Sequence, residues 1–511
     1  MLSYIVRRII TAVLILLGAS FVVYLLTAAS GDPLQELRTS QNPNKNDLIR
    51  ARSELLNLDV PAPLRYFIWL RGAAGCLVPL ANSCDLGKNL QGQPVTEQLG
   101  MAMVQTLTLV TTAVLLAIVI GVTIGIVTAL RQYSALDYGV TFLTFLFFSL
   151  PIFWAAVLLK EFGAINFNTF LKDPQIPLLV ILIVSVIFGL IGMAIARGEW
   201  KKRWIAFGGT SVAVALVLMY ISFTGWLVRP GLGPIVIALS GVGIAFGITA
   251  LTAGLKNRKA LYSSLVVVAI GLVCYYALQP LLNDATLLMI VIFAIVTVLV
   301  GIAVGYFFGG YDRGQNMRAA AITAFLVAAL ILMDRFMQSW PQYFEQTRGR
   351  PIATIGAVTP NFQGDFWTGG LDRFTHLILP TIALILISIA SYTRYSRGSM
   401  LEIMNMDYIR TARAKGLSER TVVMRHAFRN ALIPLATVVA YDIGGLIGGA
   451  VITESVFGFT GMGQMFAQGL KNVDPNPVMG FFVVVAITAL TFNLLADLVY
   501  SALDPRVKVK S

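Results

Sequence analysis

"YIRTARAKGLSERTVVMRHAFRNALIP", residues 408–434, is a basic segment in a chain that is otherwise strongly apolar. It contains one acid, Glu419, and six basic residues: Arg410, Arg413, Lys415, Arg420, Arg425 and Arg429. Such a segment is too polar to cross a bilayer. Residues 402–419 predict a helix in which Ala412 and Gly416, four residues apart, lie on one face. The segment either docks on a cytoplasmic protein through that face or is a basic loop that fixes topology and contacts anionic lipid. The residues alone favour neither interpretation.

The rest of the chain has the composition of an integral membrane protein. Of its 511 residues, 57% are hydrophobic and 12% are charged, whereas about 25% of residues in soluble domains are charged. The formal net charge of +13 does not indicate nucleic-acid binding, because the basic residues lie in loops between apolar segments, where the positive-inside rule places them. We therefore expect no nucleic-acid partner.

Apolar stretches of about 20 residues predict twelve transmembrane helices. They are residues 9–28, 103–130, 138–159, 177–196, 204–223, 232–255, 260–278, 285–308, 318–336, 377–393, 431–453 and 478–500. Arg7 and Arg8 precede the first stretch and basic residues recur in alternate loops, so both termini are expected on the cytoplasmic side. Pro151 predicts a kink in the third helix. The first stretch is expected to be an uncleaved anchor, because its apolar run is too long for a typical signal peptide.

The sequence offers no catalytic constellation. The P-loop pattern G-x-x-x-x-G-K-[ST] is absent, and no cysteine and histidine cluster has metal-ligand spacing. We therefore expect a chain that is not an enzyme and binds no cofactor or metal. Cys76 and Cys84 lie in one polar loop, where they either form a disulfide, if that loop faces an oxidising compartment, or remain free thiols.

Residues 407–434, "DYIRTARAKGLSERTVVMRHAFRNALIP", resemble the cytoplasmic coupling loop of ABC-importer permeases, in particular the B-type subunit of the dipeptide/oligopeptide permease family. The importer pattern E-A-A-x-x-x-G, followed after nine residues by I-x-L-P, coincides here with 410–416 and 426–429. The acid and the proline of that pattern are absent, so Pro434 is the candidate to supply the helix bend. The resemblance implies these ATPase-coupling residues: Arg410, Thr411, Ala412, Arg413, Ala414, Lys415, Gly416, Leu417, Arg420, His426 and Arg429.

Further motifs resemble the same family in the same order. They are "SGDP" (30–33), "SLPIFWAAVLL" (149–159), "GAVITESVFGFTGMGQMF" (449–466) and "NLLADLVYSALDPRV" (493–507). The resemblance covers about 1–165 and 365–511, and we interpret the segment without a counterpart as an inserted membrane module of six spans. The expected organisation is a permease core in two parts, 1–170 and 341–511 with the coupling loop at 394–430, interrupted by the module at 171–340. An even number of inserted spans keeps the coupling loop on the cytoplasmic side.

The resemblance implies an all-α integral membrane protein with the core of a type-1 ABC-importer permease. It implies a permease subunit that translocates di- or oligopeptides, or related small solutes, across the bacterial cytoplasmic membrane. The implied partners are a second homologous permease, two ABC ATPases that use ATP, an extracytoplasmic solute-binding protein and membrane lipids. The alternative is a twelve-span ion-coupled secondary transporter, which should show two related halves; none are visible.

Three acidic residues in the C-terminal spans, Asp442, Glu454 and Asp497, are candidates for the gate or the transport pathway. A structural role in packing or hydrogen bonding is the competing interpretation for each.

Overall fold

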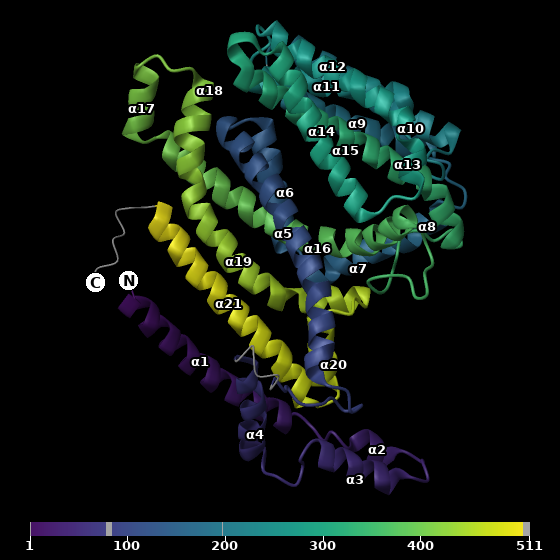
Figure 1. Cartoon of the computed structure of the whole chain (residues 1–511), viewed down its shortest axis with the longest axis vertical. Helices are drawn as coiled ribbons and strands as arrows, with labels where there is room; N and C mark the ends of the chain where they lie inside the picture. Colours follow the sequence, from purple (N-terminus) through teal and green to yellow (C-terminus); the bar gives the residue numbers. More distant parts are fainter. Residues whose placement is uncertain (1, 78–83, 197, 504–511) are drawn as a thin grey trace. The chain divides into compact units, whose positions relative to one another are not determined.

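The computed structural model describes residues 2–77, 84–196 and 198–503, and within them the regular elements are helices (Figure 1). The chain divides into two compact units. The first comprises Met1–Gly163, Thr354–Ala357 and Leu377–Ser511, and the second comprises Ala164–Ala353 and Val358–His376.

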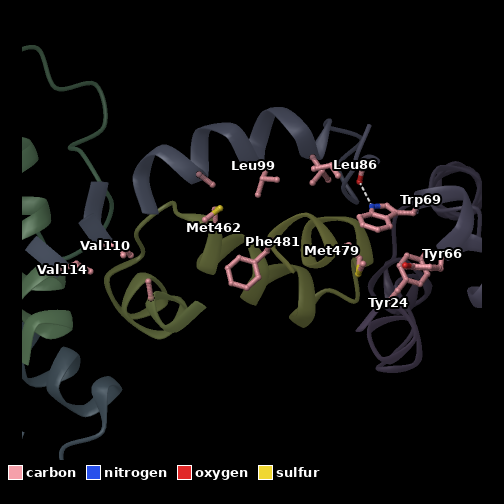
Figure 2. Close-up of a cluster of buried hydrophobic side chains, with 13 residues drawn as sticks. Tyr24, Tyr66, Trp69, Leu86, Leu99, Val110, Val114, Met462, Met479 and Phe481 are labelled. Carbon is pink, nitrogen blue, oxygen red and sulfur yellow. Dashed lines mark hydrogen bonds between the residues drawn. The ribbon is translucent and has the colours of Figure 1, made fainter. Parts of the chain in front are cut away.

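The first unit contains the long helices α1, α5, α19 and α21, most of α16, and several shorter helices. Their bounds are α1 (Leu2–Ala29), α2 (Gln35–Thr39), α3 (Lys45–Leu55), α4 (Ala62–Ala74), α5 (Val95–Leu130), α6 (Ala135–Ser149), α7 (Ile152–Lys160), α16 (Phe366–Met404), α17 (Asp407–Ala414), α18 (Glu419–Thr421), α19 (Phe428–Phe457), α20 (Met462–Lys471) and α21 (Pro475–Leu503). Aromatic side chains from α1 and α4 share one buried cluster with residues of α5, α20 and α21 (Figure 2). In this cluster Trp69 donates from Nε1 to the carbonyl of Leu86, 3.2 Å away.

Helices α5 and α16 approach each other closely because α5 carries glycines one turn apart. A Cβ on Gly121 would lie 2.8 Å from Cβ of Tyr392, and one on Gly125 would lie 2.7 Å from the carbonyl oxygen of Thr393. Small residues at this spacing allow helix backbones to pack against each other in membranes. The hydroxyl of Ser396 also donates to the carbonyl of Val122 at 3.3 Å, so the two helices are joined by polar as well as apolar contacts.

The second unit contains six long helices, α9 (Leu178–Ile195), α10 (Trp200–Thr224), α11 (Gly233–Thr252), α12 (Arg258–Ala277), α14 (Leu287–Phe308) and α15 (Arg313–Gln346), with the short α8 (Phe167–Phe170) and α13 (Gln279–Asn283). The fully buried carboxylate of Asp334 accepts from the backbone of Leu232, at 2.6 Å, and of Gly233, at 3.2 Å. It also accepts from the Tyr275 hydroxyl at 3.0 Å. This carboxylate on α15 therefore holds the start of α11.

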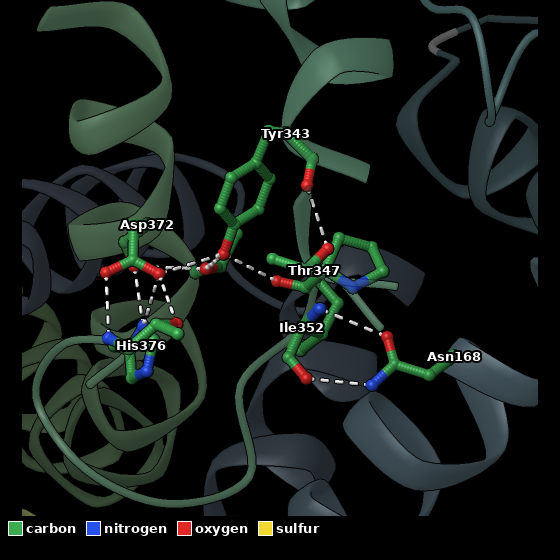
Figure 3. Close-up of polar contacts among 9 residues, drawn as sticks. Asn168, Tyr343, Thr347, Ile352, Asp372 and His376 are labelled. Carbon is green, nitrogen blue, oxygen red and sulfur yellow. Dashed lines mark hydrogen bonds and ion pairs between the residues drawn. The ribbon is translucent and has the colours of Figure 1, made fainter. Parts of the chain in front are cut away.

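A second buried polar network fixes the segment after α15 (Figure 3). Asp372 accepts from the backbone and hydroxyl of Thr359, at 2.9 and 2.6 Å, and from the Tyr343 hydroxyl at 3.3 Å. The side chain of Asn168 pairs with both backbone groups of Ile352, at 2.8 and 3.0 Å. Irregular backbone at this position is thus hydrogen-bonded internally, as burial requires.

Within the described residues, ten helices are long and apolar enough to cross a membrane. An eleventh span results if α6 and the helical run Ile152–Phe170, bent by 98°, are counted as one. These correspond to eleven of the twelve spans expected from the sequence, and the twelfth, 431–453, lies within α19. The expected kink at Pro151 is a complete break, because Pro151 has extended backbone, with a ψ of 133°, and precedes a new helix.

Candidate coupling segment

The basic segment does not form the single helix predicted over 402–419. Helix α16 ends at Met404, the backbone of Met406 is extended with a ψ of 149°, and α17 ends at Ala414. Gly416 follows with a φ of +75°, a left-handed conformation that glycine adopts without the steric cost of a Cβ. The expectation that Ala412 and Gly416 share one helix face is therefore wrong.

One face of α17 is buried against its own chain. Ile409 is fully buried and Ala412 nearly so. They belong to a cluster with residues of α5, α16, the turn before α19 and α19 itself: Ala129, Met400, Val422, Val423, Ala427 and Ala431. Ala412 therefore packs internally and is not free to receive a partner, which corrects the sequence-based interpretation of that residue.

The opposite face of α17 and the following turn are exposed. The exposed residues expected to couple to an ATPase are Arg410, Thr411, Arg413, Ala414, Lys415, Gly416, Leu417 and Arg429, whereas His426 is half-buried. The side chain of Arg420 lies outside the described residues. Exposed apolar side chains accompany the basic ones, namely Tyr408, Leu417 and Met424, which is 58% exposed. A mixed basic and apolar surface of this kind is typical of a site that docks on another protein or contacts the membrane surface.

Ion pairing leaves most of this positive charge available. Arg413 pairs with Glu419, with nitrogen–oxygen distances of 2.7 and 3.1 Å. This hydrogen bond lowers the pKa of Glu419 and raises that of Arg413. Arg410 lies 3.7 Å from the carboxylate of Asp407. Within the described residues no ion pair involves Lys415, Arg425 or Arg429.

The base of the segment is irregular in a way that the sequence did not indicate. Residues Val422–Ala427 form a π-helical turn that leads into α19, whereas Pro434, the candidate for a bend, lies inside α19. The side chains of Ser399 and Arg397 tie α16 to its neighbours. Ser399 donates to the carbonyl of Ala431 at 3.0 Å, and the Arg397 guanidinium pairs with both oxygens of Asp137, at 2.8 and 2.9 Å.

Glu454 has the surroundings of a structural carboxylate. It is fully buried and accepts from the Thr106 hydroxyl at 2.6 Å and from the backbone of Gly463 and Gln464 at 2.7 and 3.1 Å. The last two donors belong to the first turn of α20, where a negative charge is favourable. Because Thr106 belongs to α5, Glu454 joins three helices.

The remaining candidate residues are less informative. Asp442 is half-buried within α19 and lies near the hydroxyl of Tyr392. The side chain of Asp497 lies outside the described residues. Cys76 and Cys84 are joined by a disulfide, which leaves Cys274 as the free cysteine. Gate and pathway roles for the acidic residues stay predictions.

Comparison with known proteins matches both ends of the chain to components of binding-protein-dependent transport systems. The family described as "Binding-prot-dependent transport system membrane comp, N-term" matches residues 1–109, and "Binding-protein-dependent transport system inner membrane component" matches residues 268–509. The second match begins inside the module expected at 171–340, so it does not mark where that module ends.

Individual relatives are peptide permeases. The oligopeptide transport system permease protein OppB of Mycobacterium tuberculosis is 40% identical over 188 residues, which cover 36% of this chain and 55% of the relative. The dipeptide transport system permease protein DppB of Escherichia coli K12 is 42% identical over 140 residues, covering 27% and 41%. The chain thus spans about half the length of the relatives it matches. The two family matches, with the helical architecture, show that the chain belongs to the inner membrane components of binding-protein-dependent transport systems, which are multi-pass permeases without an ATPase site of their own.

Proposed function

We propose that this chain is a permease subunit of an ATP-driven importer that translocates di- or oligopeptides across the bacterial cytoplasmic membrane. The observation that carries the proposal is the segment around α17, which has one face built into the protein and the other exposed, basic and partly apolar. The peptide substrate is supported by the names of the relatives, OppB and DppB.

In this proposal two ABC ATPases hydrolyse ATP, and this chain binds no cofactor. A second, homologous permease completes the pathway, and an extracytoplasmic solute-binding protein delivers the substrate. Both termini and α17 lie on the cytoplasmic side, where one ATPase binds the exposed face of α17. Membrane lipids surround the spans.

The packing of α17 suggests how movement reaches the pathway. Ile409 and Ala412 contact a cluster that includes Ala129 of α5, Met400 of α16 and Ala431 of α19. A displacement of α17 by an ATPase therefore acts on three spans at once. Close-packed contacts of this kind transmit rigid-body shifts, because they cannot be compressed.

Gly416 provides a sharp test of the docking surface. A Cβ added there meets no atom within 4 Å, so Gly416→Arg places a large side chain on the exposed surface without an internal clash. The left-handed backbone adds a local cost of about 1–2 kcal/mol. We expect Gly416→Arg to remain in the membrane, to lose the ATPase on purification in mild detergent, and to abolish uptake of labelled dipeptide.

Two controls separate docking from folding. Gly416→Asn retains a residue that tolerates the left-handed conformation and should keep most ATPase binding and uptake. Gly314→Arg adds the same charge at another exposed glycine with no atom within 4 Å of its Cβ and should behave as wild type. Normal uptake by Gly416→Arg, or uptake that persists in cells depleted of ATP with a proton gradient maintained, would refute the proposed function.

A further inference from the structure

Helices α12, α14 and α15 of the second unit, together with Leu278 and Leu282, line a partly open apolar cavity of about 390 Å³. Its walls are aliphatic and aromatic side chains, among them Val267, Phe293 and Val300, and the polar side-chain atoms at its walls come from Cys274 and Thr297. An apolar cavity of about 150 Å³ already remains dry and accepts benzene. A cavity of this size and composition favours a hydrocarbon ligand over water.

Arg335, a cation without an acidic partner among the described residues, lies on α15 one helical turn beyond the wall of this cavity. Arg335 follows Ile331 and Leu332 on α15 by one helical turn, and both of these residues line the cavity. Its Nη1 donates to the amide oxygen of Gln338 at 3.2 Å and its Nη2 to that of Asn283 at 2.7 Å. These two amides orient the guanidinium but do not neutralise its charge.

The aromatic ring that contacts this guanidinium is itself hydrogen-bonded to a residue of the cavity wall. Arg335 lies over the ring of Trp367, with its Cζ 5.7 Å from the ring centroid. Trp367 is fully buried and donates from Nε1 to the carbonyl of Leu282, a cavity-lining residue, at 2.7 Å. The cation and the apolar cavity are therefore parts of one rigid arrangement.

No carboxylate described in the structure lies within ion-pair distance of Arg335. The adjacent carboxylate of Asp334 accepts from the backbone of Leu232 and Gly233 and from the hydroxyl of Tyr275. It also accepts from the side-chain amide of Gln338 at 2.7 Å, so it is linked to Arg335 only through that amide. A charged side chain within a span is costly unless it meets an opposite charge. The guanidinium is therefore suited to bind an anion from outside the chain.

The surroundings indicate where that anion comes from. Leu287, Leu288 and Ile295 of α14 are exposed by more than half, as expected for a helix that faces the hydrocarbon of a bilayer. We propose that the cavity binds one acyl chain of a membrane phospholipid and that Arg335 binds the phosphate of the same molecule. Charge-assisted hydrogen bonds from a guanidinium to a phosphate are strong, and they complete the environment of Arg335.

Native mass spectrometry of the purified full chain tests this site. The probes are phosphatidylglycerol and a galactolipid with the same acyl chains but no phosphate, each added to delipidated protein. Wild type should retain one phosphatidylglycerol about tenfold more tightly than the galactolipid, a difference equivalent to about 1.4 kcal/mol. Arg335→Gln should lose that preference. Ala294→Phe, which fills the cavity from α14, should weaken binding of both lipids.

Arg313→Gln is the matched control, because Arg313 also lies over an aromatic ring, that of Tyr306, in the same unit but does not line the cavity. It should retain phosphatidylglycerol like wild type. Equal retention of the two lipids by wild type, or unchanged preference in Arg335→Gln, would overturn the proposal. So would competition by glycerol 3-phosphate at the concentration of the lipid, because binding would then not depend on the acyl chain.

Discussion

Asp474, in the turn between α20 and α21, is a buried carboxyl group whose ionisation should be visible as a local change of stability. It is 3% exposed, and its Oδ2 accepts from the backbone N–H of Leu90, 2.8 Å away. Burial raises the pKa of Asp474 to about 6, while its hydrogen bonds and the charge of Arg52 oppose that rise. The contact joins the loop before α5 to the C-terminal helices.

The sign of the pH effect follows from the raised pKa. The protonated carboxyl is the form that the fold favours, so its contribution is fully present below the ordinary pKa of an aspartate. It decreases as the pH rises from there to about 6 and is absent above that value. A rise of about two pKa units corresponds to about 3 kcal/mol, which is an upper limit because opening of the turn rehydrates the group only partly.

Hydrogen exchange of the Leu90 amide measures this free energy directly. Asp474→Asn keeps a side-chain oxygen for the Leu90 N–H but cannot ionise. Between about pH 4 and about pH 7.5, the opening free energy at Leu90 should fall by about 1–3 kcal/mol in wild type and stay nearly constant in the variant. Parallel pH profiles in the two proteins would show that Asp474 does not ionise in this range, and would refute the reasoning.

Two other substitutions test the packing around the candidate sites. Ile409→Ala should lower the free energy of unfolding by about 2–5 kcal/mol and reduce uptake while the ATPase still co-purifies. Tyr408→Ala, at an exposed neighbour whose hydroxyl accepts one hydrogen bond from Asn430, should lower it by only about 0.5–1.5 kcal/mol. Loss of the ATPase from Ile409→Ala would contradict the separation of the two faces. Glu454→Leu leaves the donors at Thr106 and Gly463 unpaired, and each buried unpaired group costs about 1–3 kcal/mol. The substitution should therefore lower the thermal unfolding temperature in detergent. An unchanged temperature would argue against a structural role.

The membrane spans were predictable because a bilayer imposes one length and one polarity on every crossing helix. The first stretch, expected at 9–28, appears at Ile10–Ala29. The same logic does not locate what happens within a polar loop. At 402–419 the small residues suggested one helix face, but Gly416 is instead the residue that follows a helix end, a role that glycine also signals. One residue type thus supported two incompatible local structures, and the φ of +75° at Gly416 shows that the helix end is the one that forms.

The hydrogen-bond partners of Glu454 could not be predicted from the local sequence, for a different reason. Its hydroxyl partner, Thr106, is 348 positions away in the sequence, so a span-embedded acid looks the same whether it faces a pathway or a buried hydroxyl. Asp334 repeats the case, since its backbone partner Leu232 is 102 positions away. Long-range hydrogen bonds of this kind favour a structural role for a buried carboxylate, and a single sequence does not contain them.

The broken pair α6 and α7–α8 determines on which side of the membrane α17 lies. Apart from that pair, nine membrane-length helices of the described chain precede α17: α1, α5, α9, α10, α11, α12, α14, α15 and α16. If the pair crosses once, ten crossings place α17 on the same side as Arg7 and Arg8. If it is re-entrant, nine crossings place the basic segment on the opposite side, against the charge rule. Helix α6, with 15 residues, is about 22 Å long and too short to cross alone. The proposed function therefore predicts that the pair crosses once, as a span broken by 98° at Pro151, because only an even number of crossings places α17 on the same side as Arg7 and Arg8.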